Sequence, residues 1–170
     1  MLPLETHTRA GASLATYTQV GLIVPELRQR DTPGIVNELS LLLQRHGEVP
    51  DVLPFYHRAL NQELLANSAL ACGIALPHAR LGGVRRLQFA LGRTAEPVIW
   101  GAKGSWPVRL VFLLAVPATD AASYLHLLAS LARLGQDAER LADLRTARSG
   151  EDMLAVLDQV AIRQGGNGAL

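Results

Sequence analysis

The chain has 170 residues and a net charge of +1, with 49% hydrophobic and 18% charged residues. This length can bury an apolar core in one domain, and the composition is that of a globular protein. Because neither charge sign is in surplus, nothing in the composition favours nucleic acid as a partner or an acidic solvating tail. The single cysteine excludes an intrachain disulfide and is typical of a protein from a reducing compartment.

No segment of the sequence predicts insertion into a membrane. The longest apolar run, residues 110–117, is far shorter than the ~20 residues that a bilayer requires. The N-terminus has no basic stretch followed by an apolar one, so we expect no secretory signal. The sequence therefore predicts a cytoplasmic protein.

The N-terminal part predicts an extension and then two helices. Residues 1–18 lack any period and are interpreted as a loose extension, followed by a short strand or turn at residues 20–24. Thr32 is the expected N-cap of a helix that continues to Gly47, with proline at the first helical position. A second helix is expected from Asp51 to about residue 67.

Strands and then three further helices are expected in the rest of the chain. The strand-like runs are residues 72–76, 87–91, 98–100 and 108–116, and the last is apolar enough to be covered on both faces. The expected helices are residues 121–134, 138–148 and 151–163, and Asp120 and Asp137 can cap the first two. This order predicts a sheet covered by helices in one domain, residues 19–163, with a frayed tail at 164–170.

His78 is the strongest candidate for a functional residue. A short apolar strand leads to it, Pro77 ends that strand, and Arg80 follows two positions later. A histidine displayed at a strand end is a candidate nucleophile. The competing interpretation is a histidine hydrogen-bonded at the edge of a loop, and spacing alone favours this second interpretation.

His126 is the second candidate. On a helix it belongs to a polar stripe with Ser123, Ser130 and Arg133. A helix that directly follows a buried strand often begins at the carboxyl edge of a sheet, where α/β proteins place their sites. A merely solvated helix face explains the same stripe. The remaining histidines carry no functional prediction: His7, His46 and His57.

Other site chemistries find little support. A zinc site made of His57, His78 and His126 lacks the close ligand spacing of known zinc motifs. Neither Ser68 nor Ser105 lies in a G-x-S-x-G turn, and there is no Walker loop and no G-x-G-x-x-G. We therefore expect neither a metal nor a cofactor.

Two ordered motifs resemble the enzyme IIA domains of the bacterial phosphoenolpyruvate-dependent sugar phosphotransferase system. The resemblance is to the fructose/mannitol class, which includes the nitrogen-type regulatory members. The first motif comprises residues 59–63, Ser68 and residues 73–78; the second is the buried run at 107–117 followed by His126. Order and spacing agree from about residue 35 to 160.

The resemblance implies an α/β fold with a mixed, mostly parallel sheet sandwiched between helices. It also implies that His78 accepts a phosphoryl group from the carrier protein HPr and passes it to a IIB domain. His126 would be the second active-site histidine and would help to hold the phosphoryl group. Such a transfer between two proteins requires no metal or other cofactor.

The chain departs from the family pattern at the phosphoryl site. The family's Arg-Glu pair is Gln62-Glu63 here, and glutamine loses the charge and the two-pronged geometry of arginine. Ser68 keeps one hydroxyl of the family's turn. Our hypothesis is that Arg58, one helical turn before Gln62, or Arg80 supplies the missing charge. The phosphoryl-stabilising candidates are therefore Gln62, Ser68, Arg58 and Arg80.

Three functions remain open from the sequence. The chain is a sugar-transport IIA, or a nitrogen-type regulatory IIA whose phosphorylation state sets binding to a regulatory target protein. Alternatively, the missing arginine marks a descendant that no longer transfers phosphate and only binds partner proteins.

Overall fold

The computed structural model describes residues 12–102 and 106–163. Its helices are α1 (Thr32–Arg45), α2 (Val52–Leu65), α3 (Ala121–Leu134), α4 (Ala138–Thr146) and α5 (Gly150–Asp158). Its strands are β1 (Ile23–Val24), β2 (Ile74–Ala75), β3 (His78–Leu81), β4 (Gln88–Ile99) and β5 (Pro107–Pro117). Two short 3-10 turns precede them, at Leu14–Tyr17 and Val20–Leu22.

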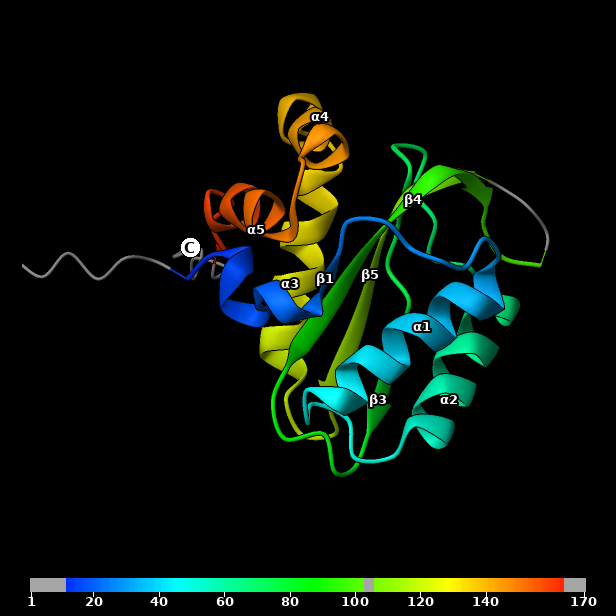
Figure 1. Cartoon of the computed structure of the whole chain (residues 1–170). Coiled ribbons are helices and arrows are strands. Elements are labelled where there is room, and N and C mark those ends of the chain that lie inside the picture. The colour runs from blue at the N-terminus through cyan, green and yellow to red at the C-terminus, as the bar shows by residue number, and fades with distance from the viewer. Residues whose placement is uncertain (1–11, 103–105, 164–170) are drawn as a thin grey trace, which may run out of the picture.

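These elements form three layers with the sheet in the middle (Figure 1). Helices α1 and α2 cover one face of the sheet, and α3, α4 and α5 cover the other. None of the helices within the described ranges combines the length and apolar character that a bilayer-spanning segment needs.

The sheet is mixed, with strand order β1-β4-β5-β2 and with β3 also paired to β5. The central pair β4 and β5 is antiparallel, and the pairings of β1, β2 and β3 are parallel. Strands β2 and β3 lie one after the other along the same side of β5. The α/β class and the mixed, mostly parallel sheet between helices are thus confirmed.

Strand β5 is the centre of the core, and the prediction that it is covered on both faces is confirmed. Its alternate residues Val111 and Leu113 belong to the core under α1 and α2. The intervening Phe112 and Leu114 belong to the core under α3, α4 and α5. A near-continuous apolar run is what such a two-sided strand requires.

The helix N-termini are mostly where the sequence places them. Asp120 caps α3 and Asp137 caps α4, each accepting a hydrogen bond from a backbone N–H three residues on. The prediction for α1 was wrong by one residue: Asp31, not Thr32, is the N-cap, and its Oδ1 accepts from Gly34 N at 2.7 Å. A carboxylate is both a good cap and a favourable charge at a helix N-terminus.

The strand boundaries required two corrections. The runs expected at residues 87–91 and 98–100 belong, apart from their outer residues 87 and 100, to one strand, β4 (Gln88–Ile99), whose register with β5 shifts between Arg93 and Val98. His78 begins strand β3 rather than following the last strand residue. Pro77 lacks an N–H but keeps its carbonyl, which accepts from Leu114 N at 2.9 Å and carries the pairing across the proline.

The ends of the described chain pack against each other. The first eleven residues of the expected loose extension lie outside the described residues, but Leu14 is buried and its N–H donates to Val160 O at 2.9 Å. Helix α5 ends at Asp158, before the expected boundary at residue 163. The expected frayed tail, residues 164–170, also lies outside the described residues.

Candidate functional site

The register of β3 decides which way His78 points. His78 is paired with Leu114 and Arg80 with Val116 in the parallel ladder with β5. Paired residues of neighbouring strands point to the same face of the sheet, and Leu114 and Val116 both face α3. His78 and Arg80 therefore lie on the α3 side, while Ala79 between them packs toward α2.

Tyr124 of α3 completes a cluster with these two side chains. Its ring centroid lies 5.5 Å from that of His78, and the guanidinium carbon of Arg80 lies 5.6 Å from the Tyr124 centroid. Burial raises the pKa of the Tyr124 hydroxyl, and the charge of Arg80 opposes that shift. No sequence pattern singled out Tyr124, although it lies in the first turn of the same helix as His126.

The backbone before His78 can fix its tautomer. The Nδ1 atom lies 3.4 Å from the carbonyl oxygen of Leu76. A proton on Nδ1 donates to this oxygen and leaves the lone pair on Nε2. Since the His78 ring is only half-buried, Nε2 can act as the nucleophile toward a group brought by another molecule.

Ser68 holds the backbone that leads to His78. Its Oγ accepts a hydrogen bond from Leu76 N at 2.8 Å. Ser68 N in turn donates to the carboxylate of Glu63 at 3.0 Å. The hydroxyl hydrogen of Ser68 can still donate elsewhere, so its role toward a phosphoryl group stays a prediction.

His126 is half-buried on α3, but the structure does not bring it into contact with His78. No hydrogen bond or ring contact joins the two imidazoles among residues 12–102 and 106–163. Two positions along a helix turn about 200° around its axis, so His126 and Tyr124 flank the buried stripe of α3 on opposite sides. The polar stripe around His126 is solvated only in part: Arg133 is exposed, whereas Ser130 is fully buried and donates to His126 O at 2.8 Å.

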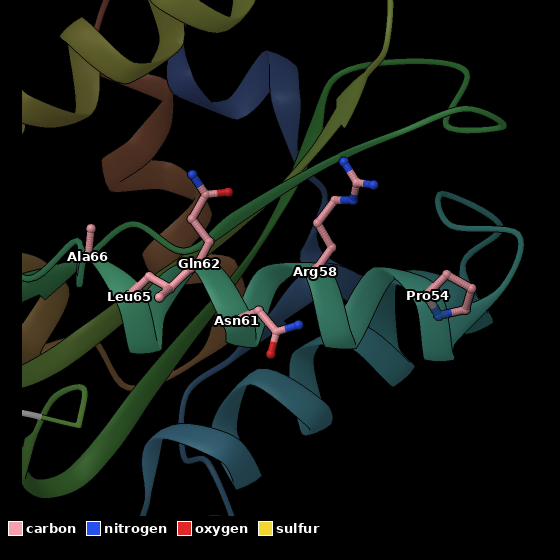
Figure 2. Close-up of a pocket in the computed structure, with 6 residues that line it drawn as sticks. All are labelled: Pro54, Arg58, Asn61, Gln62, Leu65 and Ala66. Atoms are coloured by element: carbon pink, nitrogen blue, oxygen red, sulfur yellow. The ribbon is translucent and has the colours of Figure 1, made fainter.

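Gln62 and Arg58 lie on the outer surface of α2. They line an open pocket together with Pro54, Asn61, Leu65 and Ala66. Figure 2 shows the side chains of Arg58 and Gln62 projecting from the same side of α2. Within the described part of the chain no contact joins either of them to His78. Of the two arginines proposed to replace the missing charge, Arg80 is the one that shares a face with His78.

The alternative zinc site does not form. His57 is exposed on α2, and no group of three His, Cys, Asp or Glu side chains within the described ranges could hold a metal ion.

Comparison with known proteins identifies the family of this fold. The family model described as "Phosphoenolpyruvate-dependent sugar phosphotransferase system, EIIA 2" matches residues 16–160. A nitrogen regulatory protein of Bradyrhizobium diazoefficiens is 33% identical over 140 residues, which cover 79% of this chain and 88% of the relative. The 2-O-alpha-mannosyl-D-glycerate-specific EIIABC component of Escherichia coli is 28% identical over 89% of this chain, which spans only 23% of that longer protein.

Solved structures agree with this assignment. Nitrogen regulatory protein IIA-Ntr from Neisseria meningitidis superposes with a TM-score of 0.70 at 29% identity, covering 85% of this chain and 98% of that one. The mannitol IIA of Escherichia coli shares the fold, with a TM-score of 0.69 at 19% identity over 82% of this chain and 97% of that one. The chain therefore belongs to the EIIA 2 family of the phosphoenolpyruvate-dependent sugar phosphotransferase system, as its two motifs indicated.

Proposed function

We propose that this chain is a phosphoryl carrier that accepts a phosphoryl group from HPr on His78 and passes it to a IIB domain or protein. The observation that carries the proposal is the half-buried imidazole at the start of β3, whose Nδ1 faces Leu76 O, an arrangement that leaves Nε2 as the nitrogen that can react. As a partner of HPr, the chain would act in the cytoplasm.

The transfer step needs only a nucleophile and charge stabilisation. The lone pair of His78 Nε2 attacks the phosphorus of phospho-HPr, and the electrons of the broken P–N bond return to the HPr imidazole. The new N–P bond then breaks in the same way when the IIB nucleophile attacks. The phosphoryl group brings about −1.5 to −2 charges, and Arg80 is the cation that shares its face of the sheet.

The IIB partner is supported by analogy of fold. A structure with a TM-score of 0.68 and 19% identity is a complex of the mannitol IIA and phosphorylated IIB enzymes of Escherichia coli. The same fold in this chain would offer a second protein the edge of the sheet at which β3 and α3 meet. His126, Gln62 and Ser68 remain further candidates for contact with the phosphoryl group when that protein is bound.

A regulatory role is the second candidate function. The 33%-identical relative from Bradyrhizobium diazoefficiens is a nitrogen regulatory protein, and this chain covers 88% of its length. In this role, the phosphorylation state of His78 would set affinity for a regulatory target protein. The glutamine at position 62 also keeps open a form that binds partners without transferring phosphate.

Intact-mass spectrometry after incubation with phosphoenolpyruvate, enzyme I and HPr tests the carrier function. We expect an acid-labile gain of one phosphoryl group in the wild type and in His57→Ala, which removes an exposed histidine of α2, but not in His78→Ala. No gain in the wild type while HPr itself is phosphorylated would favour the non-transferring binder.

Adding purified fructose- or mannitol-type IIB domains to the phosphorylated chain separates the two transferring roles. Loss of the phosphoryl group to a IIB domain supports transport. Retention of the group, with binding to a target that differs between the two phosphorylation states, supports regulation.

A further inference from the structure

Glu63, near the C-terminal end of α2, is an unusual buried carboxylate. Only 1% of its surface is exposed, and no cationic side chain forms an ion pair with it among the described residues. Its Oε2 atom accepts from Trp100 Nε1 at 2.7 Å and from Ser68 N at 3.0 Å. Its Oε1 atom is buried without a hydrogen-bond partner.

Hydrogen bonds continue from this carboxylate to His78. Ser68, held through its N–H by Glu63, accepts from Leu76 N at 2.8 Å, and the carbonyl of Leu76 faces His78 Nδ1. We call the residues Trp100, Glu63, Ser68, Leu76 and His78 the Glu63 network. It joins the end of β4, the C-terminal part of α2 and the start of β3, which are three separate segments of the sequence.

A contribution to the stability of the fold does not explain why a carboxylate occupies this buried position. A buried polar atom without a partner costs free energy, and well-packed apolar residues often replace buried charged groups without loss of stability. What a carboxylate provides here is one oxygen that accepts from two donors at once, the fully buried indole of Trp100 and the backbone of Ser68. That arrangement fixes the turn that follows α2.

We propose that Glu63 is a positioning residue for His78. Anchored by Trp100, it fixes Ser68, and Ser68 holds the backbone of Leu76 through its N–H. The carbonyl of the same residue, in the next peptide unit, sets the tautomer and direction of the His78 ring. The inference deepens the proposed carrier function and rests on it for its kinetic consequence. A reacting group displaced by even about 1 Å loses much of its rate, so the network acts on the transfer step rather than on the affinity for HPr.

The kinetic test compares Glu63→Leu, which removes the acceptor, with Glu63→Gln, which keeps an acceptor oxygen of the same reach. At saturating phospho-HPr we expect the transfer rate of Glu63→Leu to fall about tenfold or more, with KM changed less than about twofold. Glu63→Gln should stay within about threefold of the wild-type rate. The matched control is Glu48→Gln, since Glu48 is also buried but accepts from Arg86 instead.

A readout that needs no phosphoryl transfer separates this inference from the proposed function. In the unphosphorylated protein, the imidazole ¹⁵N signals of His78 report which nitrogen carries the proton. We expect one tautomer, protonated at Nδ1, in the wild type and in Glu63→Gln, and a mixture in Glu63→Leu. If the wild type accepts no phosphate, the carrier function fails, while these signals still decide whether Glu63 positions His78.

Trp100→Phe covers the case in which Glu63→Leu does not fold. It keeps an aromatic ring in the core but removes the donor to Glu63, and Trp106→Phe, at an exposed tryptophan, is its control. We expect Trp100→Phe to lower the transfer rate about threefold or more and to mix the His78 tautomers. Wild-type rates and wild-type ¹⁵N signals in a folded Glu63→Leu or in Trp100→Phe would overturn the inference.

Discussion

The side chains around His78 place a positive charge on a strand where the family pattern has it on a helix. Gln62 occupies the helical position and is exposed on α2, whereas Arg80 projects from β3 on the same face as His78. In the unphosphorylated chain the Arg80 guanidinium lies over the Tyr124 ring, which also contacts His78. Arg80 is therefore our candidate for the cation that would stabilise a phosphoryl group on the imidazole.

Replacing Arg80 by Ala should therefore lower the rate of phosphoryl acceptance by about a hundredfold, the usual effect of losing one charge-stabilising donor. Arg58→Ala is the matched control, since Arg58 lies on α2 with no contact to the His78 cluster in the described chain, and it should change the rate less than about twofold. Single-turnover transfer from phospho-HPr measures both. If Arg80→Ala accepts the phosphoryl group as fast as Arg58→Ala, then Arg80 does not stabilise that group on His78.

Tyr124 gives the chain a pH dependence in alkaline solution. Burial raises the pKa of its hydroxyl above the value in the unfolded chain, which is about 10. As pH rises above about 10, the unfolded state loses this proton first, so the free energy of unfolding falls until pH passes the folded-state pKa. The stabilisation is thus fully present below pH 10 and is lost above it.

Urea denaturation between pH 8 and 11 measures this effect, with Tyr124→Phe as the reference. The difference in unfolding free energy between wild type and Tyr124→Phe should be constant up to about pH 10 and should then shift against the wild type. A difference that stays flat across this range would show that Tyr124 titrates alike in both states.

At the scale of elements, Arg93 links β4 to two other segments, the loop after β1 and the end of α4. Its Nε donates to Pro25 O at 2.9 Å, and its Nη1 donates to Leu144 O and Ala147 O at 2.8 Å each. Burial lowers the pKa of this guanidinium, with the nearby charge of Arg109 adding to the shift. One side chain thereby satisfies carbonyls at the end of α4 and in the loop that follows β1.

Arg93→Met should lower the free energy of unfolding by about 3 kcal/mol, because methionine keeps the apolar stem but leaves three carbonyls without their donor. Arg85→Met, at an exposed arginine of the turn before β4, should stay within about 0.5 kcal/mol of wild type. Chemical denaturation measures both. A cost for Arg93→Met no larger than that for Arg85→Met would contradict the linking role.

At the scale of the whole molecule, the two ends of the described chain close the layer formed by α3, α4 and α5. Ser13 forms an isolated antiparallel β-bridge with Ala161, and its hydroxyl donates a hydrogen bond to Asp158 Oδ1 at 2.9 Å. Leu14 is fully buried in the core beneath these helices. The N-terminal turn therefore belongs to the folded domain.

Leu14→Ala should destabilise the protein by about 3 kcal/mol, the typical cost of a leucine-sized cavity in a core. Leu53→Ala on α2, where the leucine is 59% exposed, should cost less than about 1 kcal/mol. The two unfolding free energies are measured under the same conditions. A near-neutral Leu14→Ala would mean that the core collapses into the space at little cost.

Most helices and strands were predicted correctly from the sequence, because the caps and the apolar periods that define them lie within each element. Helix α3 has the predicted bounds, Ala121–Leu134, because its aspartate cap and its apolar period lie within the helix itself. Strand β5 was found from one unbroken apolar run. The N-cap of α1 was misplaced by one residue because Asp31 and Thr32 are both good capping residues.

What the sequence by itself determined was the α/β class, the family and the singular position of His78 after a proline, since each follows from short local patterns and their order along the chain. Only the tertiary structure decided that β4 is one strand, that Tyr124 rather than His126 contacts His78, and that Glu63 and Trp100 meet behind the site. Those outcomes depend on the register of strand pairing and on contacts between segments up to tens of residues apart, and no local pattern along the chain encodes them.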